Sequence, residues 1–391
     1  MSAPLLRPLP TAGLSSDELT DAFAGALEGS YVLAPLPPDP VEEAAVRRML
    51  AAAEEPGALP EDVALVVSTS GSTGTPKGVM LSASAIRAAA AATDDRLSGP
   101  GEWTLALGPH YVAGAMVVCR ALLADRALHL ARTDLADLSA TPARAGSPSY
   151  LSVVPTQLAR LRQDRAALAA LAGFDAILLG GAAVDPDLLA QLRDEGLRLV
   201  TTYGMSETCG GCVYDGRPLA GVGITVDPAD QRVGITGPVL FSGYLGRPDL
   251  TAAALGVLPG PDGGPVLLTG DRGEVGPDGR LHLLGRIDDV VVSGGLNVDL
   301  AAVQAAARRA IGTTELVALG VPDEVWGTRV VVVTTARTSL AALRTALAAD
   351  LSHQALPRGL SHVDVLPTTS SGKIDRRALL GAWESMHKEL A

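Results

Sequence analysis

Lysine is nearly absent from this chain of 391 residues: three occur, against 28 arginines. Arginine carries a rigid planar charge, whereas lysine offers a compact and mobile ammonium group. The chain nevertheless keeps Lys77 and Lys373 inside glycine-containing segments, which indicates that both positions need an ammonium. The alternative is that the lysines occur at these positions by chance. Lys388 lies in the C-terminal tail, and we interpret it as a solvated charge.

Other scarcities exclude whole classes of protein. Three cysteines are too few for a disulfide framework. A formal charge of −12 argues against a nucleic-acid partner, because phosphate binding needs a basic surface. No apolar run reaches the ~18 residues of a membrane span, and the N-terminus lacks the apolar region of a signal peptide. Aromatic residues make up only 3%, so the core must consist of Ala, Leu and Val. We therefore expect a soluble cytoplasmic enzyme.

Short apolar runs alternate with helical stretches over the first half of the chain. A run at 62–68 leads through a Ser/Thr/Gly-rich turn to a helical stretch at 82–96, giving strand, loop and helix. The alternation repeats as strands at 149–154, 176–179 and 198–202, with helices at 155–171 and 185–195 between them. Helical stretches at 16–27 and 41–53 precede all of these. Such alternation predicts an α/β fold with doubly wound parallel sheets.

The pattern changes after about residue 215. Short strands separated by Gly, Pro and Asp turns are expected at 232–235, 239–241, 266–269, 273–275 and 280–284, and they indicate a small β-subdomain. From residue 288 an α+β pattern follows, with strands at 290–292, 315–319, 328–335 and 362–365 and helices at 300–310 and 338–351. We predict an N-terminal domain over 1–287 and a small C-terminal domain over 288–391.

The segment Ser70-Gly71-Ser72-Thr73-Gly74-Thr75-Pro76-Lys77-Gly78 has the composition of a phosphate-binding loop. It offers backbone N–H groups, small hydroxyls and one lysine, which together suit an anion. It is not a Walker A sequence, because that pattern places Gly-Lys-Ser/Thr at its end. A nucleoside-triphosphate loop of another type is therefore favoured over a flexible Ser/Gly connector.

This segment, from Thr69 onward, resembles the phosphate loop of the adenylate-forming superfamily, which includes acyl-CoA synthetases, luciferases and nonribosomal adenylation domains. Five further segments resemble motifs of that superfamily in the same order. They are Gly180-Gly181-Ala182, Tyr203-Gly204-Met205-Ser206-Glu207-Thr208, Thr269-Gly270-Asp271, Gly285-Arg286-Ile287-Asp288-Asp289 with Ser293-Gly294-Gly295, and residues 367–376 around Lys373. One such motif is a weak signal, whereas six in order are a strong one.

The resemblance implies a two-step reaction that uses ATP, Mg²⁺ and coenzyme A. Thr69, Ser70, Gly71, Ser72, Thr73, Gly74 and Lys77 would hold the β- and γ-phosphates, and Glu207 would bind Mg²⁺. Gly180, Gly181, Ala182, Tyr203, Gly204 and Ser206 would surround the adenine side, and Asp271 and Arg286 the ribose. Lys373 would act at the α-phosphate from a small mobile C-terminal domain that turns about Asp288. Positioned cations suit this chemistry because negative charge accumulates where two anions meet.

Each carboxylate also has an ordinary structural interpretation. Glu207 could be an acid in the first turn of a helix, favoured by the helix dipole. Asp271 could be a turn former, and Asp288 could form a solvated pair with Asp289.

Two stretches, residues 154–161 and 207–216, resemble those of o-succinylbenzoate–CoA ligases of menaquinone biosynthesis. Their substrate has two carboxylates, so the second one needs a cation. Arg160 is the candidate, with a surface arginine as the alternative. Gly210 and Gly211 indicate close approach to a bound ring. His110 and Tyr111 are both candidates for an aromatic gate beside the acid.

Several alternatives stay open. The acid could instead be another aryl or fatty acid, or the chain could be a nucleotide-binding homologue without catalysis. An amino-acid-activating domain is disfavoured, because no pocket Asp for an α-ammonium group is evident. Cys209 and Cys212 form a CxxC pair, which we interpret as lining with small residues rather than as a redox or zinc site. The acidic residues that family members usually carry after the second glycine, here Gly295, are absent. The resemblance therefore supports adenylation more strongly than thioester formation. A homodimer is possible.

Overall fold

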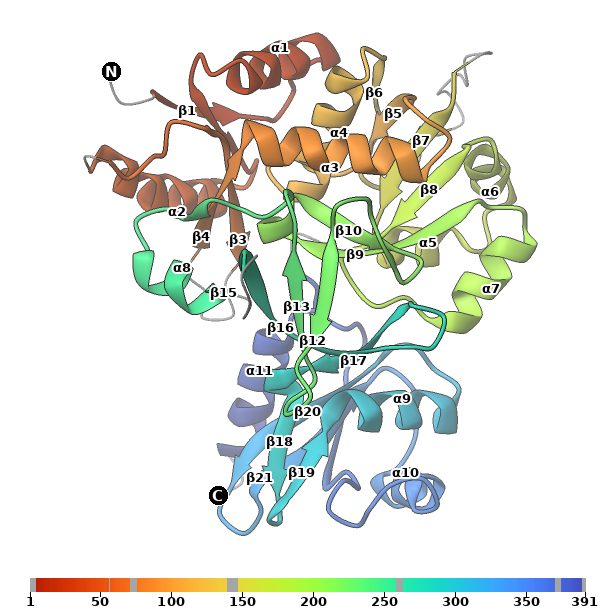
Figure 1. Ribbon diagram of the computed structural model, residues 1–391. Coiled ribbons are helices and arrows are strands. Elements are labelled where there is room, and N and C mark those ends of the chain that lie inside the picture. The colour runs from red at the N-terminus through yellow and green to blue at the C-terminus, as the bar shows by residue number, and fades with distance from the viewer. Residues whose placement is uncertain are drawn as a thin grey trace. The chain divides into compact units, whose positions relative to one another are not determined.

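The computed structural model describes residues 5–55, 57–70, 76–138, 147–257, 263–369 and 374–388, with elements labelled as in Figure 1. The chain forms two compact units. The large unit comprises Met1–Thr225, Gly234–Thr269 and Val275–Leu281, and the small unit comprises Val226–Val233, Gly270–Glu274 and His282–Ala391. The domain boundary predicted after residue 287 stays a prediction.

The first sheet of the large unit has the order β1-β2-β3-β4-β14. Its strands are β1 (Leu6–Pro10), β2 (Val32–Leu36), β3 (Val63–Ser70), β4 (Pro76–Ser82) and β14 (Gly243–Tyr244). Strands β1, β2 and β3 are parallel, and β4 and β14 run antiparallel to their neighbours. Helices α1 (Ser16–Leu27) and α2 (Pro40–Leu50) follow β1 and β2, and a 3₁₀ turn at Ala51–Glu54 extends α2. Side chains of Ser15 and Asp39 cap their first turns.

The expected order of strand, loop and helix around Lys77 is wrong, because a second strand, β4, stands between the loop and the helix. Lys77 lies on β4 opposite Thr69 of β3, and helix α3 (Ala83–Arg96) begins only after this extra strand. Val79, Met80 and Leu81 are buried, which matches a strand covered on both faces. Pro76 is tolerated because it stands at the first position of the strand. The predicted phosphate loop therefore joins two antiparallel strands.

The second sheet of the large unit has the order β11-β10-β9-β8-β7-β5-β6. Its strands are β5 (Glu102–Leu105), β6 (Leu128–Leu130), β7 (Ser149–Val153), β8 (Ala176–Leu179), β9 (Leu199–Met205), β10 (Gly210–Tyr214) and β11 (Arg217–Pro218). Strands β5 to β9 are parallel. Figure 1 shows α3 and α4 (Val112–Leu123) on one face, and α5 (Pro155–Leu161), α6 (Arg165–Ala172) and α7 (Pro186–Asp194) on the other. The predicted doubly wound α/β arrangement is confirmed.

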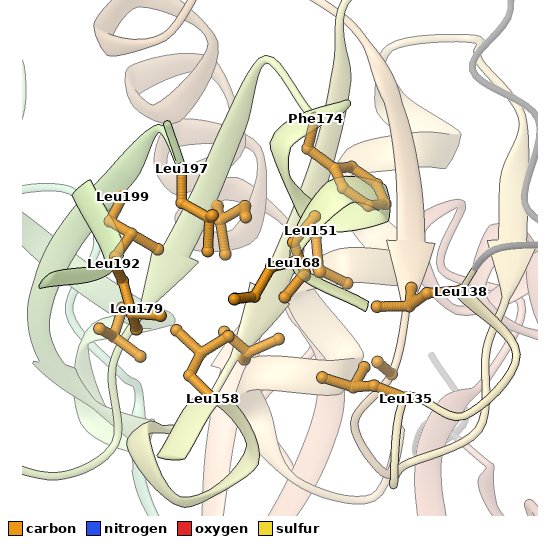
Figure 2. Close-up of a cluster of buried hydrophobic side chains, with 14 residues drawn as sticks. Leu135, Leu138, Leu151, Leu158, Leu168, Phe174, Leu179, Leu192, Leu197 and Leu199 are labelled. Carbon is orange, nitrogen blue, oxygen red and sulfur yellow. The ribbon is translucent and has the colours of Figure 1, made fainter. Parts of the chain in front are cut away.

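The core beneath α5, α6 and α7 consists almost wholly of aliphatic side chains (Figure 2). Leu151 and Val153 of β7 point into it, and so do Leu158 of α5 and Leu192 of α7. Phe174 is the single aromatic member of this cluster. Interdigitated leucines thus fill the core in place of aromatic side chains, and they reach the usual packing density of protein interiors when their rotamers fit.

The helix expected over 155–171 is two helices. The chain leaves α5 after Leu161, and the side chain of Asp164 accepts hydrogen bonds from the N–H groups of Ala166 and Ala167 at 3.0 and 3.1 Å. Asp at such a position starts a new helix by satisfying free N–H groups. The apolar spacing continues through the break, which explains why the pattern predicts one helix.

The third sheet has the order β12-β13-β16-β15, with β17 also paired to β16. Its strands are β12 (Gly223–Val226), β13 (Arg232–Thr236), β15 (Leu255–Val257), β16 (Pro265–Val275) and β17 (Leu281–Arg286), and α8 (Pro248–Ala254) precedes β15. The strands expected at 266–269 and 273–275 are one continuous strand, β16. The strand expected at 239–241 is wrong, because Val239 lies in a turn and pairing begins at Gly243.

The small unit contains a sheet of order β19-β18-β21-β20, with β22 beside β21. Its elements are β18 (Val290–Ser293), β19 (Leu296–Asp299), α9 (Leu300–Ile311), β20 (Leu316–Asp323), β21 (Gly327–Thr334), α10 (Leu340–Leu347), β22 (Gly359–His362) and α11 (Arg376–Lys388). Val332 of β21 packs with α9 and α10, while Val331 and Val333 pack with Trp383 of α11. The run of valines is therefore buried on both faces.

The predicted α+β character of this segment is confirmed, although β19 and α11 were not predicted and β22 begins earlier than the strand expected at 362–365. Among the described residues, no helix combines the length and the apolar character needed to cross a lipid bilayer.

Candidate active site

The described residues of the predicted phosphate loop lie on two paired strands of the large unit, β3 and β4. Thr69 pairs with Lys77, and Ser70 pairs with Pro76, where strand β3 ends and strand β4 begins. Gly71, Ser72, Thr73 and Gly74 lie outside the described residues, and so does Lys373. Lys77 is the second residue of strand β4, and pairing with β3 fixes its backbone.

Lys77 and Glu207 approach the same side chain, that of Tyr244. The Tyr244 hydroxyl donates a hydrogen bond of 2.6 Å to Oε1 of Glu207. The Nζ atom of Lys77 lies 5.4 Å from the centroid of the Tyr244 ring, within the range of a cation–π contact. Sequence reasoning predicted the lysine and the glutamate but missed the tyrosine between them. The structure therefore brings the two predicted charges of the phosphate and metal site around one phenol.

Backbone pairing explains how these three residues meet. Strand β14 runs beside β4, with Tyr244 opposite Val79, two residues after Lys77. Glu207 lies in a short 3₁₀ turn, Ser206–Thr208, directly after strand β9. The N–H of Phe241 donates to the backbone oxygen of Glu207 at 2.9 Å, and the Phe241 ring packs edge-on against Tyr244 at 4.9 Å. Two strands and one turn thus fix the cluster from the backbone.

The phenol of Tyr244 stays protonated under ordinary conditions. Burial raises its pKa above the usual range, and the adjacent negative charge of Glu207 raises it further. Tyr244 is only 9% exposed, whereas Lys77 and Glu207 are half-buried. A protonated phenol donates its hydrogen bond to one carboxylate oxygen, and the carboxylate keeps lone pairs for another ligand.

The described residues contain no group of three or more His, Cys, Asp and Glu side chains able to hold a metal ion. Glu207 therefore belongs to no such group. A carboxylate outside a larger group still suits Mg²⁺, which is commonly held in phosphoryl-transfer sites by one or two carboxylates together with substrate phosphates and water. The donor set fits Mg²⁺ brought in with a nucleotide better than a resident protein-bound ion.

Tyr203, Gly204 and the 180–182 segment lie at the carboxyl ends of two neighbouring parallel strands. Gly180, Gly181 and Ala182 come directly after β8, and Tyr203 and Gly204 lie near the end of β9. Ligands of doubly wound folds bind outside these strand ends. The structure therefore places the predicted adenine-side residues along one edge of the second sheet.

The hairpin of β9 and β10 depends on glycine. A Cβ atom at Gly204 would overlap the backbone oxygen of Gly210, and one at Gly180 would overlap the hydroxyl of Thr202. Gly210 has a φ of +85°, which L-residues rarely adopt. Gly211 lies in strand β10 beside it, with Thr202 and Tyr214 in close contact. Close backbone approach within the hairpin therefore explains Gly204, and the side chains of Thr202 and Tyr214 leave little space for a Cβ at Gly180 and Gly211.

The structure distinguishes the two candidates for an aromatic gate. His110 is 6% exposed, and its Nδ1 atom is buried without a hydrogen-bond partner among the described residues. Burial lowers the pKa of His110 to about 4, so the ring is neutral near pH 7. Tyr111 is half-buried, precedes the first turn of α4, and lies 4.1 Å from His110 between ring centroids. Of the two, Tyr111 is the more accessible ring.

A cavity of about 400 Å³ opens beside this segment in the large unit. Leu105, Leu107 and Pro109 are among its apolar lining residues, and Arg132 and Asp134 are among its charged ones. None of the residues predicted to bind the acid lines it.

Arg160 lies on the last turn of the seven-residue helix α5 and is exposed. Within the described part of the chain it has no carboxylate within ion-pair distance. Gln157, one turn earlier, is buried and donates hydrogen bonds to the backbone oxygens of Ala106 and Thr133 at 3.0 and 2.7 Å. The guanidinium of Arg160 is thus available to a ligand, and its role stays a prediction.

The three cysteines are free and buried. Burial raises the pKa of Cys119 to about 12 and that of Cys212 to about 11, and it also raises the pKa of Cys209. A thiol must ionise to act as a nucleophile or a metal ligand. These pKa directions favour an inert structural role for the CxxC pair.

The small unit contains the predicted ribose-binding pair. Arg286 Nη1 lies 3.2 Å from Oδ1 of Asp271, and Arg286 Nη2 lies 3.5 Å from Oδ2 of Asp288. Asp288 is 76% exposed, whereas Asp289 is largely buried and pairs with Arg376 at 2.7 Å. Burial raises the pKa of Asp289, against the effect of Arg376. The predicted hinge residue Asp288 is therefore a solvated acid, and its neighbour Asp289 is the anchored one.

The fold and these motifs define an adenylate-forming enzyme, and the comparison with protein families agrees. The model of the AMP-binding enzyme family matches residues 15–245, and that of the AMP-binding enzyme C-terminal domain matches residues 302–373. The chain belongs to this family. The superfamily predicted from the six motifs is thereby confirmed.

Particular relatives narrow the comparison. The chain is 41% identical over 333 residues to a Mycobacterium tuberculosis protein named probable 2-succinylbenzoate–CoA ligase, covering 82% of this chain and 84% of that protein. It is 32% identical over 371 residues to a feruloyl-CoA synthase of an Amycolatopsis species, covering 83% and 71%. The crystal structure of ATP-bound MatB from Rhodopseudomonas palustris shares the fold, with a TM-score of 0.77 at 22% identity, over 99% of this chain and 97% of that one.

Proposed function

We propose that this chain is an ATP-dependent acid–CoA ligase whose acid is 2-succinylbenzoate, the compound also called o-succinylbenzoate. The observation that carries the proposal is the 41% identity to a probable 2-succinylbenzoate–CoA ligase over most of both chains. The cluster of Lys77, Tyr244 and Glu207 supports it, because it combines a cation and a carboxylate where a nucleotide would need them.

The reaction has two steps. In the first, a carboxylate oxygen of the acid attacks the α-phosphorus of ATP, and the bond from that phosphorus to pyrophosphate breaks. In the second, the sulfur of coenzyme A attacks the acyl carbon, and AMP leaves. Charge accumulates on the leaving pyrophosphate in the first step and on AMP in the second, so positioned cations stabilise both transition states.

The proposal gives the named residues distinct tasks. Lys77 holds the leaving phosphates, together with Thr69, Ser70, Gly71, Ser72, Thr73 and Gly74. Lys373 acts at the α-phosphate, and Asp271 and Arg286 bind the ribose. Gly180, Gly181, Ala182, Tyr203, Gly204 and Ser206 surround the adenine side. Fixing the substrate in this way lowers the entropic cost of the reaction.

Glu207 would hold Mg²⁺, which when bound neutralises phosphate charge. The carboxylate is suited to this task because the Tyr244 hydrogen bond engages only Oε1. The residue's own contribution is to present an oriented oxygen beside the leaving phosphates.

The acid is proposed to bind through Arg160, Tyr111 and the Gly210–Gly211 backbone, with His110 supporting the Tyr111 ring. An accessible guanidinium suits the second carboxylate of 2-succinylbenzoate. A second candidate acid is a hydroxycinnamate such as ferulate, favoured by the 32% identity to a feruloyl-CoA synthase.

The test is pyrophosphate release by the purified chain over a panel of acids, with and without coenzyme A. The panel contains 2-succinylbenzoate, ferulate, benzoate, malonate and hexanoate. We expect the highest kcat/KM with 2-succinylbenzoate and formation of its thioester when coenzyme A is present. Higher kcat/KM with ferulate would establish the second candidate, and no release with any acid would refute both.

Rotation of the small unit about Asp288, a cytoplasmic location and a homodimer stay predictions.

A further inference from the structure

Tyr244 joins the two charges of the candidate active site, although nothing in the six motifs includes it. It donates a 2.6 Å hydrogen bond to Glu207, and Lys77 lies 5.4 Å from its ring centroid. Its side chain is 9% exposed, so both contacts are made in a largely desolvated place. Hydrogen bonds to a charged group are short and strong in such surroundings.

We propose that Tyr244 is a positioning residue that orients the Glu207 carboxylate for the metal–nucleotide complex and limits the positions of the Lys77 ammonium. The proposal rests on the proposed function in one respect, the use of a metal–nucleotide substrate. It does not depend on which acid is activated.

The geometry assigns the two ends of Tyr244 separate effects. The hydroxyl engages Oε1 of Glu207, and this fixes the rotation of the carboxylate, so that Oε2 faces a defined direction. The ring offers its negative face to Lys77 without neutralising it. A full ion pair between Lys77 and Glu207 would remove both charges from use by a ligand, whereas an intervening phenol keeps them apart and available.

Contacts other than the Tyr244 hydroxyl hold strand β14 in place. The N–H of Tyr244 donates to Thr251 Oγ1 at 2.9 Å, and β14 pairs with β4 through Gly243 and Tyr244. The Phe241 ring contacts the Tyr244 ring rather than its oxygen. Replacement of Tyr244 by phenylalanine therefore removes the hydrogen bond to Glu207 and leaves the ring contacts and the backbone in place.

A second tyrosine supplies a matched control. The Tyr150 hydroxyl donates to the backbone oxygen of Gly99 at 2.8 Å, and its ring is fully buried beside Trp103. Tyr150 stands near the start of β7, whereas the candidate site lies at the carboxyl ends of these strands. Tyr150→Phe thus removes a buried tyrosine hydroxyl of the same unit at the amino-terminal end of an inner strand.

The experiment uses Mn²⁺ as a spectroscopic probe for Mg²⁺. A preformed equimolar Mn²⁺–ATP complex is titrated with the wild-type chain, Tyr244→Phe or Tyr150→Phe, without any acid, and electron paramagnetic resonance measures the fraction of the complex bound to the protein. We expect the dissociation constant of the protein for Mn²⁺–ATP to rise about 10-fold or more in Tyr244→Phe, in keeping with the strength of hydrogen bonds to charged groups. Tyr150→Phe should leave it unchanged.

A second variant guards against a general loss of structure. In a Glu207→Gln background, Tyr244→Phe should cause little further loss of Mn²⁺–ATP binding, because the carboxylate that the phenol orients is gone. Turnover gives an independent check: the adenylation kcat should fall about 10-fold or more in Tyr244→Phe while the KM for the acid stays within about twofold.

The outcomes separate the two proposals. Wild-type or tighter Mn²⁺–ATP binding by Tyr244→Phe would overturn the positioning role, and so would equal losses in Tyr150→Phe. Additive losses in the double variant would also overturn it. If Mn²⁺–ATP binding behaves as expected but no acid of the panel releases pyrophosphate, the proposed function fails and the positioning role stands.

Discussion

His110 offers a direct test of how the structure controls a charge near the candidate acid-binding segment. The ring is 6% exposed, and burial lowers its pKa to about 4. In the unfolded chain the imidazole titrates near pH 6.5. Between these values the unfolded state binds more protons than the folded state, so the free energy of unfolding falls as pH falls through this window. The protonated ring carries an N–H at both nitrogens, and Nδ1 is buried without a hydrogen-bond partner among the described residues.

The size of the effect follows from the two pKa values. At pH 5, an unfolded pKa near 6.5 and a folded pKa of about 4 make this single residue cost the fold about 2 kcal/mol, whereas at pH 7 the cost is only ~0.2 kcal/mol. The replacement His110→Gln, a neutral side chain of similar size, removes this titration. Other titrating groups are the same in both proteins, so the difference between them isolates His110.

Urea unfolding of wild type and His110→Gln from pH 4 to pH 8 measures this difference. We expect the wild type to lose about 2 kcal/mol more than the variant between pH 7 and pH 5. A constant difference over the whole range would contradict the argument, because it would mean that His110 titrates alike in the folded and unfolded states.

Three further predictions concern named positions. Gly204→Ala should lower the free energy of unfolding by about 1–3 kcal/mol, because a Cβ there overlaps Gly210; thermal unfolding checks this, and Gly264→Ala, with no atom near its Cβ, is the control. Lys373→Ala should reduce adenylation by orders of magnitude but still convert supplied acyl-adenylate to thioester, so equal loss in both half-reactions would refute its role. Arg160→Ala should raise the KM for 2-succinylbenzoate about 10-fold, in line with a lost charged hydrogen bond, while the neighbouring exposed Arg162→Ala should not.

Sequence patterns predicted elements well where local signals and burial agree. Helix α1 begins and ends at the expected residues, because Ser15 and Glu18 form a capping box before an amphipathic stretch. Strand β4 was missed because its apolar residues stand between a glycine-rich turn and a strong helix start at Ser82. The pairing with β3 that makes it a strand is a tertiary contact, and local pattern does not contain it.

In the candidate site, too, residues in local motifs were predicted and a residue brought in by tertiary contacts was missed. Lys77 was predicted from the composition of its loop, and Glu207 from the resemblance of its segment to a motif of the adenylate-forming superfamily. Tyr244 was missed because it is 37 positions from Glu207 along the chain, and only the pairing of β14 with β4 brings it there. A short apolar run with a glycine before the tyrosine was the available signal, and we assigned that run to a strand at 239–241. Sequence reasoning also left His110 and Tyr111 undecided, since burial alone separates them.

The buried cysteines make the chain suitable for selective thiol labelling. Cys119, Cys209 and Cys212 are shielded from solvent, and their raised pKa values leave almost no thiolate near pH 7. A maleimide dye should therefore react only with cysteines introduced at exposed positions, such as Val41 of the large unit and Val325 of the small unit, which are 77% and 83% exposed. Fluorescence energy transfer between two such dyes would follow the distance between the units as ATP, acid and coenzyme A are added, in a chain that keeps all its native thiols.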